Sequence, residues 1–214
     1  MTHPVPTGFV HRFEPGTAET APPLLLLHGT GGDENDLIPL GRALSPGSPL
    51  LSLRGPVLEN GMPRFFRRLS EGVFDEADVR RRAGELAEFI ARARAAYGLA
   101  APVAVGFSNG ANIAAATLLL HPEVLAGAVL LRAMVPLAES PEADLVGRPV
   151  LLLSGALDPI VPAENAERLA GMLERAGAAV THTVQPAGHG LSQADLAAAG
   201  AWLGRKSGLR ASAA

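Results

Sequence analysis

Short, uninterrupted apolar runs alternate along this chain with longer segments of helical period, and this alternation constrains the fold more than any other feature. Apolar runs of this kind are typical of strands whose two faces are both covered, as in parallel sheets flanked by helices. The alternation therefore predicts an α/β fold with a mostly parallel sheet and helices on both faces. We expect strands at residues 24–27, 50–53, 103–106, 128–131, 150–153 and 180–184, and an antiparallel edge strand at 10–14.

The clearest helical period lies in residues 76–97, where apolar side chains recur every three or four positions. Asp75 is placed to cap the amino end of this helix, and Gly98 is placed to end it. Two further amphipathic helices are expected at residues 162–176 and 192–203, the second with Ser192 as its N-cap.

Composition predicts one globular domain over residues 1–204, since 48% of the chain is hydrophobic and only 18% is charged. Residues 205–214 lack periodicity and are expected to form a frayed tail. A net charge of −3 gives no basic surface for nucleic acid. The sequence has no apolar run of about 18 residues for a membrane span, and no secretion signal, so we expect a cytoplasmic protein. The absence of cysteine excludes a cysteine nucleophile and thiolate metal sites.

The strongest functional signal is the segment G-F-S-N-G at residues 106–110, which follows an apolar run and precedes a helical run at 111–120. A strand that turns sharply into a helix needs small residues two positions either side of the exposed serine. Gly106 and Gly110 meet that need, and Ser108 then stands at a helix amino end that favours a developing anion. A chance glycine-rich turn is the plain alternative. The context on both sides favours Ser108 as a nucleophile.

A serine nucleophile needs a base and an orienting acid, and in α/β-hydrolases these follow it in the order acid, then histidine. Asp158 comes just past the apolar run at 150–153, where open α/β sheets place their ligand-side loops. His189 lies between two glycines after the last predicted strand. Asp144 and Asp195 are less suited, because the first precedes a strand and the second lies inside a predicted helix. We therefore predict Ser108, Asp158 and His189 as a catalytic triad.

An oxyanion hole needs two N–H donors, one of them commonly the amide that follows the nucleophile, here that of Asn109. The second is expected from the glycine-rich loop H-G-T-G-G-D at residues 28–33, with Thr30 as the donor. A phosphate-binding loop is the alternative for such a segment, but it lacks both a G-K-[ST] ending and a full G-x-G-x-x-G.

With these motifs together, the chain resembles the small carboxylesterase/phospholipase family of α/β-hydrolases, which includes acyl-protein thioesterases and relatives of dienelactone hydrolases. It is most similar to a bacterial branch through H-G-T-G-G-D-E at 28–34, G-F-S-N-G-A-N at 106–112, M-V-P at 134–136, and the segments at 63–68 and 71–75. The likeness runs from Leu24 to Leu203. It implies a hydrolase with no cap or a minimal cap, often a homodimer. It departs from dienelactone hydrolases, whose nucleophile is a cysteine.

The interval between the strands that end at Leu131 and begin at Val150 holds 18 residues, too few for a helical lid, so an open site is expected. Substrate contacts are expected from apolar side chains on loops near the catalytic edge, with ordinary core packing as the alternative for each. These are Phe65, Phe66, Phe107, Met134 and Leu191. An acidic substrate group could bind Arg64, Arg67, Arg68 or Arg132, although a solvated or salt-bridged role is equally consistent with the sequence.

The sequence thus predicts a serine esterase that cleaves small-molecule esters of short to medium acyl chain through an acyl-enzyme, with no metal or organic cofactor required. The same residues could act on thioesters or lysophospholipids. A ligand-binding relative without catalysis is an alternative from another class, and the presence of all three triad residues argues against it.

Overall fold

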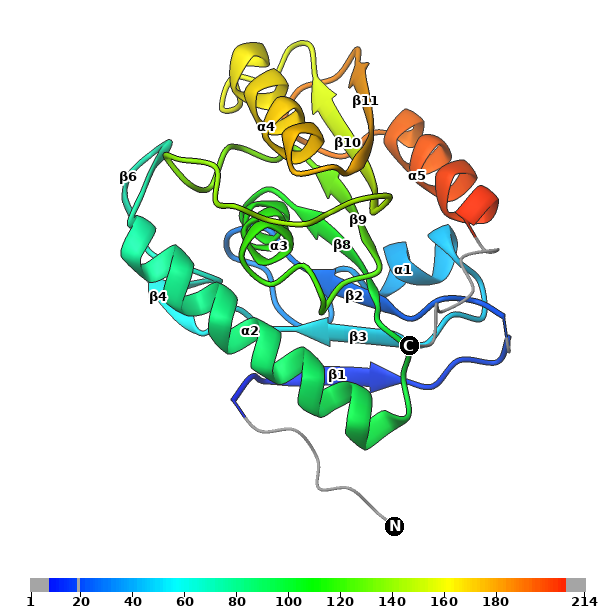
Figure 1. The fold of residues 1–214 in the computed structure, drawn as a ribbon. Helices are drawn as coiled ribbons and strands as arrows, with labels where there is room; N and C mark the ends of the chain where they lie inside the picture. Colours follow the sequence, from blue (N-terminus) through cyan, green and yellow to red (C-terminus); the bar gives the residue numbers. More distant parts are fainter. Residues whose placement is uncertain (1–7, 19, 207–214) are drawn as a thin grey trace.

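The computed structural model describes residues 8–18 and 20–206, and its centre is a seven-stranded sheet in the order β1-β3-β2-β8-β9-β10-β11 (Figure 1). The neighbouring strands are parallel except for β1, which pairs antiparallel with β3 at one edge. This arrangement confirms the predicted α/β class. The strands are β1 (His11–Glu14), β2 (Leu24–Leu27), β3 (Leu50–Leu53), β8 (Val103–Phe107), β9 (Gly127–Leu131), β10 (Pro149–Gly155) and β11 (Ala179–Gln185).

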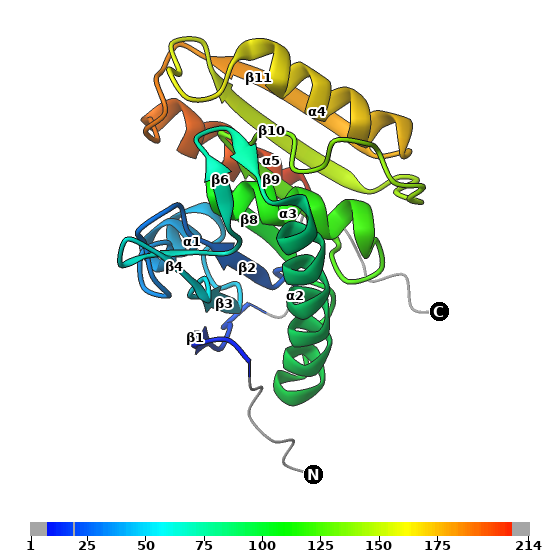
Figure 2. The ribbon, with the colours of Figure 1, turned by 90° about the vertical axis from the view of Figure 1, so that its left-hand side faces the viewer.

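Two helix layers cover the sheet and explain why its strands are apolar throughout (Figures 1 and 2). One layer holds α2 (Glu76–Tyr97), α3 (Asn109–Leu120) and α4 (Ala163–Arg175), and the other holds α1 (Ile38–Leu44) and α5 (Gln193–Lys206). In β2, Leu25 and Leu27 enter the core beneath the first layer, whereas Leu24 and Leu26 enter the core beneath the second. Successive side chains of a strand point to opposite faces, so both sets must be apolar.

The caps of the helices follow the residues that the sequence marks. The side chain of Asp75 accepts a hydrogen bond from the amide of Asp78 at the start of α2, and Gly98 ends that helix in the left-handed region with a φ of 66°. At α5, the Ser192 hydroxyl accepts from the amide of Asp195. This helix runs to Lys206, and because residues 207–214 lie outside the described part of the chain, the expected tail stays a prediction.

Two hairpins and one helix between β2 and α2 were not predicted from the sequence. The hairpins are β4 (Val57–Glu59) with β5 (Met62–Arg64), and β6 (Arg68–Ser70) with β7 (Val73–Phe74). The turn of the first is Asn60-Gly61, with φ values of 51° and 78°. This dipeptide is a strong local hairpin signal, because both positions tolerate positive φ. The hairpins follow the carboxyl end of β3, so they reach the edge of the sheet where ligands bind in such folds.

The connection between β9 and β10, residues 132–148, contains neither helix nor strand. No helix within residues 8–18 and 20–206 is both long enough and apolar enough to cross a bilayer.

Candidate active site

Ser108 lies between β8 and α3 with a φ of 52° and a ψ of −114°, a conformation that L-residues rarely adopt. The flanking glycines make this turn sterically feasible. A Cβ on Gly106 would lie 2.6 Å from the amide nitrogen of Ala111, and one on Gly110 would lie 2.0 Å from the carbonyl oxygen of Leu27. The amide of Ser108 donates to the carbonyl of Leu131 on β9 over 2.8 Å. Backbone packing therefore holds the hydroxyl at the carboxyl end of the sheet.

Loops after three different strands bring Ser108, His189 and Asp158 together. Nε2 of His189 lies 2.9 Å from Oγ of Ser108, and its Nδ1 lies 2.8 Å from Oδ2 of Asp158. The second oxygen, Oδ1, accepts from the amides of Ile160 and Val161 over 2.8 and 3.1 Å. The Asp158 side chain is fully buried. The proton on Nδ1 is thereby directed to the carboxylate, which leaves the Nε2 lone pair facing the serine hydroxyl.

The loop after β2 brings the backbone of Thr30 to the same end of the sheet as Asn109. Within residues 8–18 and 20–206, neither the Thr30 amide nor the Asn109 amide has a hydrogen-bond acceptor. The Thr30 hydroxyl accepts from Nη1 of Arg64 over 2.6 Å, so the side chain is engaged and the backbone N–H is the donor left for a ligand. Asn109 is the first residue of α3, where N–H groups and the helix dipole favour negative charge.

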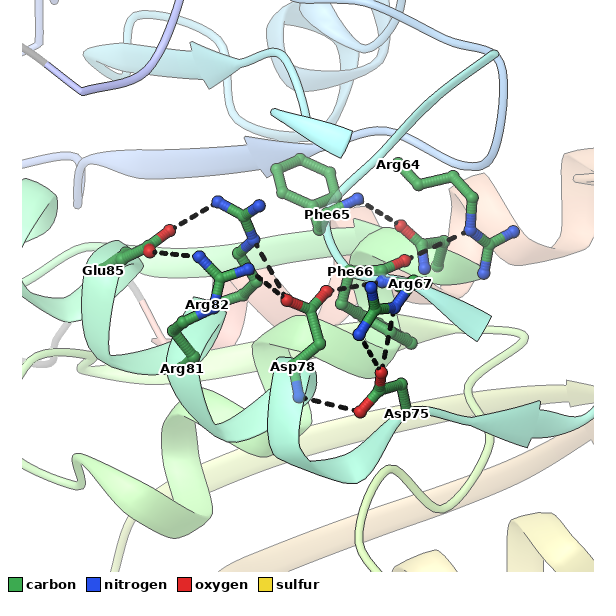
Figure 3. Close-up of polar contacts among 10 residues, drawn as sticks. Arg64, Phe65, Phe66, Arg67, Asp75, Asp78, Arg81, Arg82 and Glu85 are labelled. Carbon is green, nitrogen blue, oxygen red and sulfur yellow. Dashed lines mark hydrogen bonds and ion pairs between the residues drawn. The ribbon is translucent and has the colours of Figure 1, made fainter. Parts of the chain in front are cut away.

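Residues 63–67 connect both of these N–H donors to the start of α2, a link that the sequence analysis missed. The carbonyl of Pro63 accepts from the amide of Gly31 over 2.9 Å, and the amide of Phe65 donates to Oδ1 of Asn109 over 2.7 Å. The backbone N–H of Arg67 donates to Oδ2 of Asp78 over 2.8 Å, as Figure 3 shows.

Further ion pairs stabilise this attachment. The guanidinium of Arg67 forms an ion pair with Asp75, and that of Arg81 forms one with Asp78 (Figure 3). The segment therefore braces the glycine-rich loop and the turn at Ser108 against one helix. Residues 63–68 belong to the family resemblance, but nothing in their sequence indicates that they brace the glycine-rich loop and the turn at Ser108.

His28 stabilises the glycine-rich loop through two hydrogen bonds of its buried ring. Its Nδ1 donates to the carbonyl of Gly29 over 2.6 Å, and its Nε2 accepts from the amide of Gly55 over 2.9 Å. Both bonds need a neutral ring. Burial lowers the pKa of His28 from its ordinary value, and this outweighs the opposing effect of the Gly29 carbonyl. His28 therefore stays neutral while it holds the loop that carries Thr30.

None of the four arginines presents a free cation to an acidic substrate. Arg132 is fully buried and pairs with Asp195, so of its two alternatives the structure favours the salt-bridged role. Arg64 is 3% exposed, donates to Thr30 and pairs with Glu59. The other two form salt bridges, Arg67 with Asp75 and Arg68 with Glu59.

The expected substrate contacts separate into two groups. Phe65 and Phe66 are 1% and 0% exposed and belong to the core beneath α2 and α3, which favours the core-packing alternative, and their contact with substrate stays a prediction. The segment that carries both rings is attached to α2 through the bond from the Arg67 amide to Asp78, which directs the rings into this core. The ring of Phe107 is half-buried, with its centroid 5.5 Å from that of His189. Met134 is 8% exposed, and Leu191 is half-buried. Contacts of Phe107, Met134 and Leu191 with substrate stay a prediction.

The sequence model of the phospholipase/carboxylesterase family matches residues 12–205. The chain belongs to this family. It is 46% identical to MhqD of Bacillus subtilis over 194 residues, which cover 90% of this chain and 96% of that protein. A crystal structure of a Bacillus cereus carboxylesterase superposes with a TM-score of 0.90 at 45% identity, covering 92% of this chain and 94% of the other.

A carboxylesterase from Mesorhizobium loti superposes with a TM-score of 0.87 at 31% identity, covering 95% and 99% of the two chains. Membership in the family and this agreement in fold identify the protein as a carboxylic ester hydrolase of the α/β-hydrolase fold, a family that acts on small-molecule esters.

Proposed function

We propose that the protein cleaves carboxylic esters of short to medium acyl chain by a two-step acyl transfer, with Ser108 as nucleophile, His189 as general base and Asp158 as the acid that orients the base. The continuous hydrogen-bond chain from Asp158 through His189 to Ser108 carries this proposal. In that geometry the imidazole can remove the serine proton without any rearrangement of the protein.

In the first step, Nε2 of His189 takes the Ser108 proton as Oγ attacks the ester carbonyl carbon. The carbonyl oxygen becomes an oxyanion, and the amides of Thr30 and Asn109 donate to it, each worth about 3 kcal/mol in comparable sites. The imidazolium then protonates the leaving alcohol as the C–O bond breaks, and an acyl-enzyme remains. Water repeats the sequence on the acyl-enzyme, with His189 again accepting and returning one proton.

The expected acyl length follows from the absence of a lid in residues 132–148 and from the side chains around Ser108. Leu157 and Ile160, on either side of Asp158, are 74% and 38% exposed. Met62 lies against Gly31 and is 40% exposed. Such side chains can contact a few methylenes, each worth about 0.8 kcal/mol, but they do not enclose a long chain. The same groups would also attack a thioester, so the leaving group is decided by substrate comparison.

The test is a series of p-nitrophenyl esters from acetate to palmitate, with matched acyl thioesters, measured for the wild type and for S108A. We expect kcat/KM to level off or fall beyond medium chains, no activation at an oil interface, and loss of turnover in S108A with its circular dichroism unchanged. Labelling by a fluorophosphonate probe should disappear in S108A. Turnover near the wild-type rate in S108A would overturn the nucleophile, and an unlabelled wild type would favour a binding protein.

A further inference from the structure

The loop that carries His189 packs closely at its start, where a Cβ on Gly155 would lie 2.5 Å from the carbonyl oxygen of Ala187, but its glycines on either side of His189 lie in more open space. A Cβ on Gly190 would meet nothing within 4 Å, and one on Gly188 would meet only the carbonyl oxygen of Leu157, at 3.6 Å. The carbonyl of Ala187 accepts from the amide of Leu157 and anchors the start of the loop. Beyond that point, the carbonyls that flank His189 accept hydrogen bonds from a side chain of another element.

Arg132, the residue after β9, supplies that support. Its Nε donates to the carbonyl of Gly188 over 2.9 Å, and its Nη2 donates to that of Gly190 over 3.3 Å. These two carbonyls lie on either side of His189. Nη1 donates to the carbonyl of Leu153, near the carboxyl end of β10, over 3.2 Å, which ties the loop to the sheet.

Asp195 on α5 completes the arrangement. Its two oxygens accept from Nη1 and Nη2 of Arg132 over 2.9 and 2.6 Å, so all five N–H groups of the guanidinium are used. Oδ2 also accepts from the amide and the hydroxyl of Ser192, over 2.8 and 2.7 Å. Burial by itself raises the pKa of Asp195, but the bonds from Arg132 and Ser192 outweigh it and hold the pKa below its ordinary value.

Stability alone is a weak reason for such a pair, because fully buried ion pairs are often no more stable than well-packed apolar residues of similar volume. Arg132 moreover adopts a φ of 56°, a strained value for this residue type. A planar fork that binds one carboxylate and three carbonyls also has a geometry that lysine cannot reproduce. These features are explained if Arg132 and Asp195 hold the loop that carries His189 in place.

We propose that Arg132 and Asp195 are positioning residues that hold the His189 loop, so that Nε2 stays within reach of the Ser108 hydroxyl. The inference rests on the proposed function of His189. A displacement of the imidazole by about 1 Å is enough to cost on the order of 100-fold in rate. The pair thus acts on kcat through His189 and has no contact with substrate.

The decisive variant is R132M/D195L, which replaces both charges by apolar side chains of similar volume and avoids an unpaired buried charge. We expect a folded enzyme whose kcat falls about 100-fold while KM changes by less than about threefold. R132K, which can rebuild part of the hydrogen bonding, should recover some of the lost kcat, and D195N should fall between R132K and the wild type. L86A, a core change on α2, is the control for loss of stability alone, and we expect it to lower the Tm while kcat stays near the wild-type value.

A double-mutant cycle with H189A separates positioning from general damage. In the H189A background, the residual hydrolysis should be the same with and without R132M/D195L, because the pair acts through the missing imidazole. An equal loss in both backgrounds, or a kcat within twofold of wild type in R132M/D195L, would overturn the proposal. S108A and H189A are measured in parallel: if either keeps wild-type turnover the proposed function itself fails, whereas loss in both with normal R132M/D195L refutes only the positioning role.

Discussion

The two sides of the site are held in place by different kinds of interaction. On the side of Ser108, backbone atoms are packed so closely around Gly106 and Gly110 that a Cβ at either position would lie within 2.6 Å of a backbone atom. On the side of His189, the loop packs closely against Gly155 at its start, but a Cβ at Gly190 would meet open space, and Arg132 binds the carbonyls on either side of the histidine. One half of the site thus depends on local sterics. The other depends also on an ion pair between residues 63 positions apart.

The largest effect is expected on the side of His189, from a change that keeps shape and alters only proton placement. In D158N, the amide would donate to Nδ1 and favour the imidazole tautomer with its proton on Nε2, which cannot accept from Ser108. We expect kcat to fall about 10⁴-fold with a smaller change in KM. D144A, whose exposed carboxylate accepts from the amide of Val146, is the control. A large loss in D144A, with D158N near wild type, would mean that Asp158 is not the acid.

The steric contrast itself can be tested with two alanine substitutions. G110A should lower kcat/KM by at least about 100-fold and reduce the Tm, since the new Cβ would lie 2.0 Å from the carbonyl of Leu27 and displace the turn at Ser108. G190A should stay within about threefold of wild type, because its Cβ would meet no atom within 4 Å. Steady-state kinetics and thermal unfolding of both variants measure the contrast. Equal losses would show that the two sides are not held differently.

A smaller effect is expected where residues 63–67 are attached to α2. D78A would leave the part-buried amide of Arg67 without its acceptor, at a cost of about 1 kcal/mol in the free energy of unfolding. Because Phe65 in the same segment binds the side chain of Asn109, we also expect kcat to fall by about tenfold. Urea unfolding and kinetics are measured together, with D144A again as control. Loss of stability with unchanged kcat would limit the segment to a structural role.

The smallest effect is a pH dependence of stability from His28. Its pKa is lowered by burial, so the unfolded chain binds this proton more readily than the folded protein. The contribution is therefore fully present above the ordinary pKa of about 6.5 and is lost as the pH falls from there toward the lowered value, with a slope of at most about 1.4 kcal/mol per pH unit. Urea unfolding between pH 5 and 8 should show a flatter curve for H28N than for wild type. Identical slopes would contradict the assignment.

Elements with a strong local pattern were predicted closely from the sequence. The predicted bounds of β2, β3 and α2 agree with the structure, because uniform apolar runs and a capped helical period are local signals that tertiary packing reinforces. The two hairpins were missed, although Asn60-Gly61 carried the turn signal for one of them. Their strands are only two or three residues long, too short for alternation to be recognised.

For the site too, the order of residues along the chain indicated some features, whereas others arise only from tertiary packing. The spacing of G-F-S-N-G and the order of Ser108, Asp158 and His189 were available from the sequence. The catalytic roles of these three residues stay predictions that the variants above test. The core packing of Phe65 and Phe66 could not be decided from the sequence, because an apolar pair on a loop does not reveal whether the loop folds back onto a helix.

By itself, the sequence determined which strands are covered on both faces and where the chain must turn sharply, since these follow from periodicity and from the steric needs of glycine. Only the tertiary structure decided which charges are buried and what they hold. The sequence around Arg132 or Asp195 does not indicate that either residue is buried in an ion pair. The two meet because the end of β9 and the start of α5 lie beside the same loop. A buried ion pair is a property of two distant segments brought into a medium of low dielectric, so no local pattern in either segment specifies it.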